Sequence, residues 1–422
     1  MPNYYIWTIG CQMNKAESER LAARFEGLGY QPVNSVNKAD LIVLNSCVVR
    51  QSAEERVVNK LRDLRHLKKE RPDVILALTG CLVDSDTKQL KKKFSQVDQF
   101  FKAGDSPPWL EKTETLSLPM RPSPSVYVTI SQGCDNFCSY CIVPYRRGRE
   151  RSRPLEEIVC EAKELVRRGA KEIILLGQNV DSYGHDLEGK PDLADLLTEL
   201  NEIEGLVRLR FLTNHPKDMS QKLIESINGL EKVCEQINLP VQAGSDEILK
   251  AMKRGYTVEQ YQQLVAQIRE KIPGIVISTD VIVGFPGETE AQFRQTLDLL
   301  SKIKFATVHV AAYSPRPGTA AAREFEDDIL LEEKKARRAE IERLQEKIQA
   351  EANARLLGET VEILVEGKKK GKWYGRTRTD KLVFFRSDRE FLGQLVNIKI
   401  EKTGPWSLQG TIKTESDTQE EK

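Results

Sequence analysis

Short apolar segments of strand length alternate with helical segments along most of the chain. The first series of strands covers residues 4–10, 41–46 and 74–80, which read YYIWTIG, LIVLNS and VILALTG. Between them, residues 16–29 and 52–70 repeat apolar side chains at helical spacing. Such an alternation predicts a parallel sheet, in which the carboxyl ends of all strands lie at one edge.

A longer series of the same kind follows a stretch that is rich in proline and serine. Helical segments such as residues 155–169 and 257–272 lie between its strands. Six strand–helix repeats are too few for a closed eight-stranded barrel, so they predict an open, partial one, with its active site at the carboxyl ends of the strands. The six strands are predicted over residues 126–131, 172–177, 207–213, 236–242, 275–284 and 306–313.

The carboxyl-terminal part has a different pattern. Residues 328–357 predict one long charged helix, and Gly358 is a plausible stop. The short strands that follow predict a small β-barrel. The expected fold class is therefore α/β, in five parts. These are an amino-terminal parallel α/β sheet domain (1–116), a linker (117–125), a partial (βα)6 barrel with the long helix (126–357), a small β-barrel (358–414) and a disordered tail (415–422).

Three cysteines, Cys134, Cys138 and Cys141, lie together in the run QGCDNFCSYC. Their spacing brings three thiolates to one loop and offers no fourth. Three thiolates can hold three irons of a four-iron cluster and leave one iron open. A zinc knuckle is the alternative, but structural zinc is almost always four-coordinate and the next histidine is the distant His185. The spacing therefore favours the cluster.

Three further cysteines each follow one of the amino-terminal strands. Cys11 comes after the first, Cys47 after the second and Cys81 after the third. A single free cysteine is most often a small buried hydrophobe. Because the carboxyl ends of parallel strands share one edge, where ligands bind, these three are expected to converge. They predict a second three-cysteine cluster. Cys160 and Cys234 belong to neither set and are interpreted as packing residues.

The overall composition excludes several classes of protein. Lys+Arg 64 against Asp+Glu 63 gives a formal net charge of +1, so only local charge can predict a nucleic-acid partner. Eight cysteines are too sparse for a disulfide scaffold in a chain of 422 residues. The sequence starts without a basic and apolar leader, and no apolar run approaches bilayer length. We therefore expect a cytoplasmic protein with no membrane partner.

Two basic segments predict contacts with RNA. The run RRGRERSR follows the first cysteine loop, and guanidinium groups there suit a phosphate or a carboxylate. In the predicted β-barrel, cations interleaved with aromatic rings suit a phosphate backbone with unstacked bases, although a solvated hairpin tip is the simpler alternative. The candidate residues are Arg146, Arg147, Arg149, Lys368, Lys370, Trp373, Tyr374, Arg376 and Arg378.

Motifs along nearly the whole chain resemble one family, the methylthiotransferases. This radical S-adenosylmethionine (SAM) family has a second cluster in its amino-terminal domain and a carboxyl-terminal TRAM domain. None of the cluster cysteines departs from the family pattern, whereas Ile9, Ser46, Asn238 and Ala243 do. The matching motifs are TIGCQMN (8–14), NSCVVR (45–50), TGC (79–81), SYCIVPYRRGRERSR (139–153), DVIVGFPGETE (280–290), YSPRPGT (313–319), GQLV and PWSLQG (405–410).

The resemblance implies two [4Fe-4S] clusters and SAM as cofactors. Cys134, Cys138 and Cys141 would hold the cluster that chelates SAM and cleaves it to a 5′-deoxyadenosyl radical. The other three cysteines would hold an auxiliary cluster whose open iron carries sulfide. One SAM would methylate this sulfur and another would supply the radical that attacks the substrate.

For SAM itself, three residues are candidates. Tyr140, just before the last cysteine of the loop, is placed either near the adenine or in the core. Gly177 occupies the place where the superfamily's glycine-rich loop meets the SAM amino group. Asp280 could reach a ribose or anchor its own strand.

The motifs CQMN and YSPRPGT indicate the tRNA branch of the family. The implied reaction adds a methylthio group to C2 of N6-isopentenyladenosine, the base just 3′ of the anticodon. The implied partners are the tRNA anticodon stem-loop and a reducing electron donor such as flavodoxin. Alternatives are a methylthiotransferase acting on ribosomal protein S12 or on another tRNA adenosine, and a zinc-stabilised RNA-binding protein without activity.

Overall fold

The computed structural model describes most of the chain. Arg50 of the second motif, Ser117 of the linker and the predicted tail lie outside the described residues. The described ranges are 1–49, 51–83, 87–105, 107, 109–110 and 118–413.

The amino-terminal part is a five-stranded sheet in the order β2-β1-β3-β4-β5, and all of its ladders are parallel. Its strands are β1 (Asn3–Thr8), β2 (Gln31–Pro32), β3 (Leu41–Ser46), β4 (Ile75–Gly80) and β5 (Gln99–Phe100). Every residue of the central β3 is buried, as expected of a strand that is covered on both faces. The predicted parallel sheet is confirmed. The edge strands β2 and β5 were not predicted, because a strand of two residues is too short to show a pattern of apolar residues.

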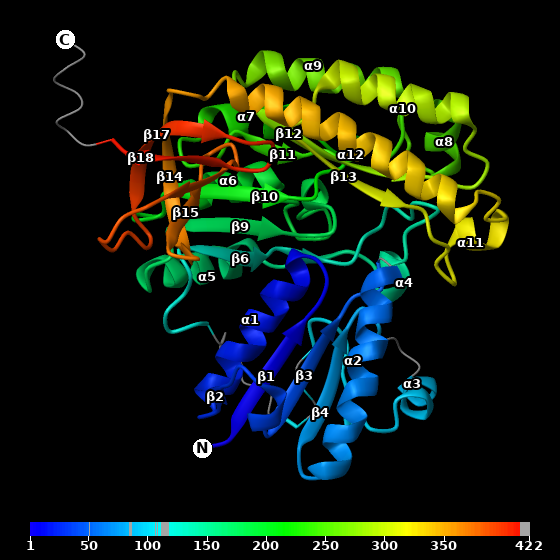
Figure 1. The fold of residues 1–422 in the computed structure, drawn as a ribbon, viewed down its shortest axis with the longest axis vertical. Helices are drawn as coiled ribbons and strands as arrows, with labels where there is room; N and C mark the ends of the chain where they lie inside the picture. Colours follow the sequence, from blue (N-terminus) through cyan, green and yellow to red (C-terminus); the bar gives the residue numbers. More distant parts are fainter. Residues whose placement is uncertain (50, 84–86, 106, 108, 111–117, 414–422) are drawn as a thin grey trace.

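Helices cover both faces of this sheet. They are α1 (Gln12–Gly27), the 3-10 turn η1 (Val36–Lys38), α2 (Gln51–Glu70) and α3 (Thr87–Lys93). Leu21 and Phe25 of α1 pack on one face with Leu41, while Val57 and Leu61 of α2 pack on the other. At its start α1 also contacts the second part of the chain, so it lies between the sheet and the barrel (Figure 1).

The second part is an open barrel of six parallel strands, which confirms the predicted architecture. Its ladder is broken in the middle: β6-β9-β10 and β11-β12-β13 form two three-stranded sheets. An isolated bridge, Leu209 to Val233, links the two halves, and the backbone N–H of Asn214 donates to the carbonyl of Asn238 at 3.0 Å. The strands are β6 (Ser125–Thr129), β9 (Glu172–Leu176), β10 (Arg208–Leu212), β11 (Gln236–Asn238), β12 (Val276–Val283) and β13 (Thr307–Ala312).

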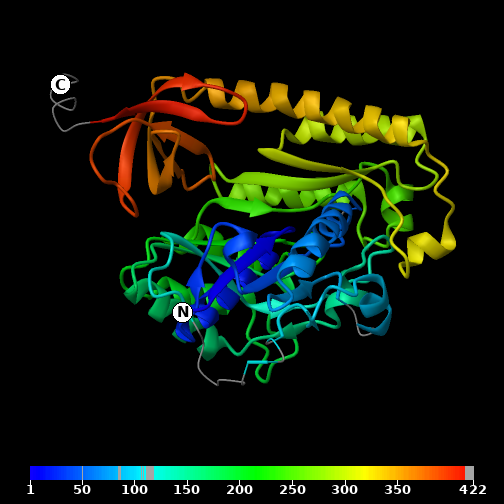
Figure 2. The same ribbon diagram turned by 60° about the horizontal axis from the view of Figure 1, so that its bottom comes forward.

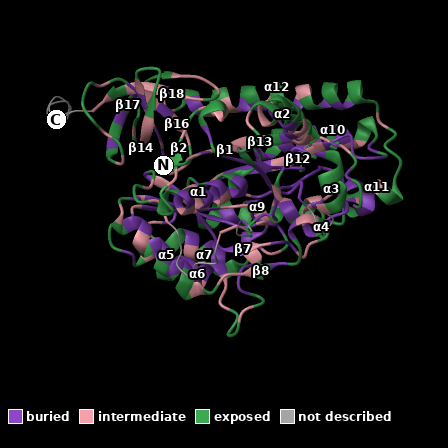
Figure 3. Ribbon diagram, turned by 90° about the horizontal axis from the view of Figure 1, so that it is seen from below, coloured by how far each residue is buried: buried purple, intermediate pink, exposed green. Residues whose placement is uncertain are grey.

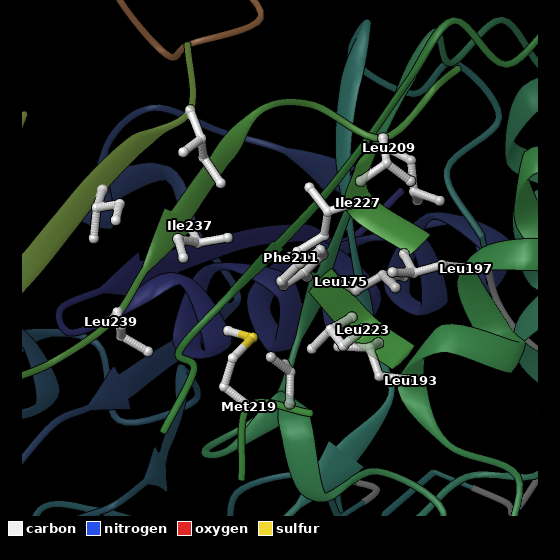
Figure 4. Close-up of a cluster of buried hydrophobic side chains, with 14 of the residues drawn as sticks. Leu175, Leu193, Leu197, Leu209, Phe211, Met219, Leu223, Ile227, Ile237 and Leu239 are labelled. Atoms are coloured by element: carbon white, nitrogen blue, oxygen red, sulfur yellow. The ribbon is translucent and has the colours of Figure 1, made fainter. Parts of the chain in front are cut away.

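Helices surround this barrel, and side chains from both form the largest core of the molecule (Figure 4). Thr257 and Thr289 begin α9 and α10 with capping boxes. A short antiparallel hairpin, β7 (Ser131–Gln132) with β8 (Arg151–Ser152), closes the cysteine loop at its base. The helices are α4 (Val143–Arg147), α5 (Leu155–Arg167), η2 (Val180–Ser182), α6 (Leu193–Asn201), α7 (Gln221–Gly229), α8 (Asp246–Ala251), α9 (Val258–Lys271), α10 (Glu290–Ile303) and α11 (Ala320–Glu324).

The long charged helix is α12 (Leu331–Ala354), and it lies along the barrel as predicted (Figure 1). From Lys334 to Ile348 its buried residues recur every three or four positions, so one face packs inward and the other is exposed (Figure 3). Ile341 and Ile348 belong to the inward face. The helix connects the open barrel to the last part of the chain.

The last part is a closed five-stranded barrel in the order β14-β15-β16-β18-β17. Its strands are β14 (Thr360–Lys369), β15 (Lys372–Arg376), β16 (Leu382–Phe385), β17 (Leu395–Thr403) and β18 (Leu408–Ile412). Ile363, Trp373 and Phe385 are among the side chains of its core. Figure 2 shows this small barrel, in orange and red, at one end of α12, with the amino-terminal sheet in blue beside the open barrel.

The small barrel is attached at the amino ends of the open-barrel strands. Two buried arginines of β10 reach into it: Arg208 donates to the carbonyl of Arg376 at 2.6 Å, and Arg210 donates to the carbonyl of Arg378 at 2.7 Å. In return, the Arg378 guanidinium donates to Glu235 at 2.7 Å. The carboxyl ends of the strands, where the cysteine loop lies, are therefore at the opposite end from the small barrel.

A carboxyl group in this junction makes stability depend on pH. Burial raises the pKa of Glu366 from its ordinary value of 4.5 to about 7, although Arg376 opposes the shift. The folded chain thus holds this proton more tightly than the unfolded chain does. The resulting stability is full below the ordinary pKa and is lost as the pH rises through about 7.

We therefore expect Glu366→Gln to remove part of the pH dependence. The fall in unfolding free energy between about pH 5 and pH 8 should be smaller in this variant by ~1–3 kcal/mol. Urea unfolding at several pH values measures this difference. The exposed Glu390 provides the control, since Glu390→Gln should leave the slope unchanged. Equal slopes for wild type and Glu366→Gln would contradict the assignment.

Candidate metal centres and cofactor site

The first set of cysteines converges at the carboxyl edge of the amino-terminal sheet. Cys11 is the cap residue of α1 and lies three residues after the end of β1, while Cys47 and Cys81 immediately follow β3 and β4. A Cβ atom placed on Gly10 would lie 2.9 Å from the Cβ of Cys47. Cys11 is exposed and the other two are buried, and none of them forms a disulfide. Three thiols thus lie together at one partly open edge.

Buried amides hold these strand ends in register. Asn14, which is fully buried, donates to Asn45 at 2.8 Å and to the carbonyl of Ser46 at 2.9 Å. Its own Oδ1 lies 3.3 Å from the Sγ of Cys11. The carbonyl of Ser46 also accepts from the backbone of Cys81 at 2.9 Å. These positioning residues were missed as such, although they lie in the motifs CQMN and NSC.

One of the two buried thiols of this set, that of Cys81, has a raised pKa. Burial raises the pKa of Cys81 to about 11, while the Arg147 guanidinium opposes the rise and Cys47 and Cys11 add to it. The mutual effect requires the three thiols to be close. Without metal the Cys81 thiol is therefore protonated at neutral pH, and a metal that binds there must displace the proton.

Gly80, next to Cys81, tolerates no side chain. Its φ is +91°, and a Cβ would lie 2.2 Å from the carbonyl oxygen of Ser46. We expect Gly80→Ala to destabilise the iron-free chain by ~3 kcal/mol or more, because β3 and β4 must separate beside Cys47. Iron uptake at this edge should fall with it. Urea unfolding and iron analysis after anaerobic reconstitution measure the two effects.

Gly27, in the last turn of α1, is the matched control for this substitution. A Cβ there meets no atom within 4 Å. Gly27→Ala should be neutral or stabilise the helix by up to ~1 kcal/mol. Wild-type stability in Gly80→Ala would contradict the close approach of β3 and β4.

The second set of cysteines lies in the loop between β7 and α4. Cys134 and Cys138 are buried, and Cys141 is partly exposed. Fully buried Ser139 anchors the loop, since its hydroxyl donates to the carbonyl of Ala251 at 2.7 Å. Burial raises the pKa of Cys134 to about 11 and that of Cys141 to about 12. Like Cys81, the thiols of Cys134 and Cys141 are therefore protonated at neutral pH when no metal is bound.

Each set of cysteines has a buried guanidinium on one of its thiols. Arg254 donates to the Sγ of Cys138 at 3.3 Å, and Arg147 donates to the Sγ of Cys81 at the same distance. Arg147 ends α4, which begins just after Cys141, yet it contacts the other set. α4 and Arg147 therefore link the cysteine loop of the barrel directly to the cysteine-bearing edge of the sheet.

The loop after β13 strengthens this juxtaposition. Ser314 donates to Gln51 at 2.9 Å, and Arg316 donates to Glu54 at 3.2 Å. Both partners lie in the first turn of α2, close to Cys47. The carboxyl mouth of the open barrel is thus turned towards the cysteine-bearing edge of the sheet.

The barrel mouth also carries buried polar atoms without a protein partner. Their side chains come from the carboxyl ends of β6, β9, β10 and β11. A ligand with amino, carboxylate and hydroxyl groups, such as SAM, would satisfy them. Among the described residues, the atoms without a hydrogen-bond partner there are Ser131 Oγ, Asn179 Oδ1, Asn214 Oδ1, His215 Nε2 and Asn238 Oδ1.

Burial shifts the pKa values of two titratable groups of this mouth, Asp181 and His215, towards their neutral forms. Burial raises the pKa of Asp181 to about 7, although it accepts from Asn214 and from the backbone of His215. Burial and then Arg254 lower the pKa of His215 to about 2, so this imidazole is neutral. A neutral imidazole with a free Nε2 offers a hydrogen bond rather than a charge.

The three SAM candidates lie in or beside this mouth. Gly177 is buried, and a Cβ there would lie 2.6 Å from the Ser131 hydroxyl, so only glycine fits. Tyr140 is half-buried and packs in a cluster with Phe285 and Tyr313. Asp280 accepts from Asn238 at 3.2 Å, which ties it to the neighbouring strand.

The RNA candidates divide into exposed and buried residues. Lys368 and Lys370 are exposed at the tip of the β14–β15 hairpin, and Lys368 lies 5.0 Å from the ring of Trp373. Arg149 is exposed and bound to Asp135 at 2.7 Å. Tyr374, Arg376 and Arg146 are partly exposed; Arg376 pairs with Asp380 at 3.1 Å.

The remaining three RNA candidates need correction. Trp373 is 3% exposed in the core of the small barrel, so its ring has no face for a base. Arg147 is buried against Cys81 and Glu17, and Arg378 holds the small barrel to Glu235.

The two cysteines outside both sets differ from each other. Cys160 is exposed and is not a packing residue as predicted, whereas Cys234 is buried as predicted.

The geometry disfavours a structural zinc ion. Within the described ranges, no group of three or more His, Cys, Asp or Glu side chains is arranged to hold one metal ion. A zinc site draws four ligands to a single point. A four-iron cluster binds each thiolate to a different iron and so needs a wider spacing. Three thiolates without a fourth protein ligand are the donor set that a four-iron cluster with one open iron requires.

Family models match all three parts of the chain. The Radical SAM superfamily matches residues 128–300, the Uncharacterized protein family UPF0004 matches residues 3–102 and the TRAM domain matches residues 354–413. The central match defines the class of protein: a radical SAM enzyme, which binds a [4Fe-4S] cluster and SAM.

Curated relatives narrow this class. A tRNA-2-methylthio-N(6)-dimethylallyladenosine synthase of Dehalococcoides mccartyi is 56% identical over 412 residues, 98% of this chain and 99% of its own. Another, of Herpetosiphon aurantiacus, is 50% identical over 97% of both chains. The chain belongs to the family of tRNA-2-methylthio-N6-dimethylallyladenosine synthases. The resemblance found in the sequence is thereby confirmed.

Solved structures support the fold alone. The radical SAM methyltransferase TsrM from Kitasatospora setae aligns with a TM-score of 0.51 and 15% identity, over 77% of this chain and 78% of its own. The cobalamin-dependent radical SAM enzyme OxsB aligns with a TM-score of 0.53 and 12% identity, over 82% of this chain and 56% of its own. None of the described helices combines the length and hydropathy of a membrane span.

Proposed function

We propose that this chain is a radical SAM tRNA methylthiotransferase. It adds a methylthio group to C2 of N6-isopentenyladenosine, next to the anticodon. The observation that carries the proposal is the contact of Arg147 with Cys81: Arg147 ends the helix after the barrel's cysteine loop, and Cys81 lies at the cysteine-bearing edge of the sheet. Relatives with 44–56% identity are named as enzymes of this reaction.

Two [4Fe-4S] clusters and SAM fit the residues present. Cys134, Cys138 and Cys141 hold the first cluster; Cys11, Cys47 and Cys81 hold the auxiliary one. When bound, these groups supply the radical, sulfur and methyl chemistry that no side chain can perform on an unactivated C–H bond. The buried thiols, raised in pKa, give up their protons as the metal binds.

The protein's own residues bind and orient. Gly177 leaves room beside the Ser131 hydroxyl. The polar atoms of the mouth that lack a partner among the described residues would form hydrogen bonds with a polar ligand such as SAM. Tyr140 packs at the edge of the loop, and Asp280 is fixed by Asn238. We propose these three as SAM contacts. The amide network of Asn14 and its partners fixes the spacing of the auxiliary thiols.

The RNA is proposed to contact both ends of the molecule. The remaining candidates are Arg146, Arg149, Lys368, Lys370, Tyr374 and Arg376. If they bind phosphates, affinity for tRNA falls steeply with added salt. We further propose the domain bounds 1–116, 126–357 and 358–414, a cytoplasmic location without a membrane partner, and a flavodoxin-like electron donor.

Product analysis tests the function. Anaerobically reconstituted protein is incubated with SAM, a reductant and isopentenylated tRNA, and the digested nucleosides are examined by mass spectrometry. We expect the 2-methylthio nucleoside. A parallel reaction with ribosomal protein S12 and one with tRNA that lacks the isopentenyl group test the alternatives. The proposal would be overturned if isopentenylated tRNA gave no product while S12 or the tRNA without the isopentenyl group did.

A further inference from the structure

The auxiliary cysteines come from the amino-terminal sheet, but the cations beside them come from the barrel. Arg147 is 9% exposed; its Nε donates to Cys81 and its Nη1 donates to Glu17 at 2.6 Å. Arg316 is 7% exposed, and its Nη1 donates to Glu54 at 3.2 Å. The two guanidiniums thus approach the site from two separate loops of the other half of the chain.

Both guanidiniums have donors to spare. Arg147 Nη2 and Arg316 Nε and Nη2 are buried and have no hydrogen-bond partner among the described residues. A buried N–H without a partner is costly, and a buried cation more so. Glu17 and Glu54 engage one nitrogen of each group and orient it, but leave the remaining donors unused. The unused donors indicate an anionic group that is absent from the protein itself.

Geometry places this group beside the auxiliary cysteines. Arg147 contacts Cys81, and Arg316 is held by Glu54 in the first turn of α2, a helix that begins four residues after Cys47. Burial alone lowers the pKa of Arg147, yet Glu17 and Cys81 more than offset it and the pKa is raised. Burial also lowers the pKa of Arg316, and Glu54 and then Cys47 act against it. Auxiliary cysteines therefore act on both arginines: Cys81 and Cys11 on Arg147, and Cys47 on Arg316. The site beside both arginines is therefore the auxiliary site, to which Cys11 contributes the third thiol.

A four-iron cluster on three thiolates carries net negative charge, and one-electron reduction adds to it. Nearby charge and hydrogen bonds to the sulfurs are among the factors that set a cluster's reduction potential. We propose that Arg147 and Arg316 are positioning residues that stabilise the auxiliary cluster and raise its reduction potential. The auxiliary site is then completed by the barrel and is not a property of the sheet alone. This inference depends on the proposed second cluster.

The test uses the full chain with the barrel cysteines replaced (Cys134→Ala, Cys138→Ala and Cys141→Ala), so that any cluster signal comes from the auxiliary site. In this background Arg147 and Arg316 are each changed to Met and to Lys. Iron content and the midpoint potential, followed by electron paramagnetic resonance in a redox titration, are the readouts. Neither readout depends on turnover.

We expect each Met variant to take up iron and to be harder to reduce. Its equilibrium constant for one-electron reduction should fall at least about tenfold, which is a shift of about 59 mV to lower potential. The Lys variants keep the charge and should lie closer to the unchanged background. Arg254→Met is the matched control: this buried arginine contacts Cys138 instead, so it should leave the auxiliary potential unchanged.

Other outcomes overturn the proposal. Met variants that bind iron with an unchanged potential would show that the arginines only join the two halves of the chain, and so would an equal shift in Arg254→Met. If the Met variants take up no iron, the Lys variants decide: iron uptake with Lys supports the role of charge, and failure with both refutes it. If the variant that lacks only the three barrel cysteines binds no iron, the proposed second cluster is itself refuted, and with it the role of the two arginines.

Discussion

Replacing Cys11, Cys47 and Cys81 together by alanine is expected to abolish methylthiolation of tRNA and to leave SAM cleavage intact. The three thiols lie at one edge of the sheet, while the loop that holds Cys134 is built from barrel elements. Removal of the first set therefore leaves the second anchored as before. The reconstituted variant should hold about four irons instead of about eight.

Two measurements decide this prediction. Formation of 5′-deoxyadenosine from SAM reports the barrel site, and nucleoside mass analysis reports the transfer of sulfur. Cys160→Ala is the matched control, because this exposed cysteine belongs to neither set. It should keep the full iron content and both activities. Thiomethylated RNA from the triple variant would refute the assignment of Cys11, Cys47 and Cys81 as the sulfur site.

The reciprocal variant should lose both activities. With Cys134, Cys138 and Cys141 replaced by alanine, SAM cleavage is expected to fall to the level of protein-free controls. Methylthiolation must then fall with it, because no side chain can break the C2–H bond. Yet about four irons should remain at the auxiliary edge. Residual SAM cleavage in this variant would place the cleaving cluster elsewhere.

The sequence predicted those features that depend on strand order and strand ends. Every open-barrel strand begins within one residue of its predicted start, because continuous apolar runs between turn residues are a clear signal. Their ends lie within two residues of the prediction except in β11, which ends at Asn238 and not at residue 242. The convergence of Cys11, Cys47 and Cys81 followed from one rule of parallel sheets, which the order β1-β3-β4 satisfies.

Side-chain direction was harder to predict, and the RNA candidates show why. Lys372, Trp373 and Tyr374 are consecutive in β15, so their side chains alternate between the two faces of the strand. A ring beside a basic residue in the sequence is therefore not beside it on the surface. Period-two alternation alone could have shown that Trp373 and Tyr374 do not both face solvent.

The cations of the site could not be predicted from the sequence at all. Arg147 and Arg149 are two positions apart in one basic run, yet Arg147 is buried on a thiol and Arg149 is exposed. Their difference depends on where α4 ends and on how the barrel meets the sheet, which no local pattern encodes. Arg254 and Arg316 lie more than a hundred residues from the cysteines that they approach.

The attachment of the small barrel at the amino ends of β9 and β10 sets a minimum size for a substrate that is held at both ends. Each of these strands has five residues, so the hairpin with Lys368 and the cysteine loop are at least ~15 Å apart along the strand direction. A lone nucleoside cannot bridge that separation, whereas a folded stem with its loop can. The protein would thus select substrates by their length, independently of any contact with a particular base.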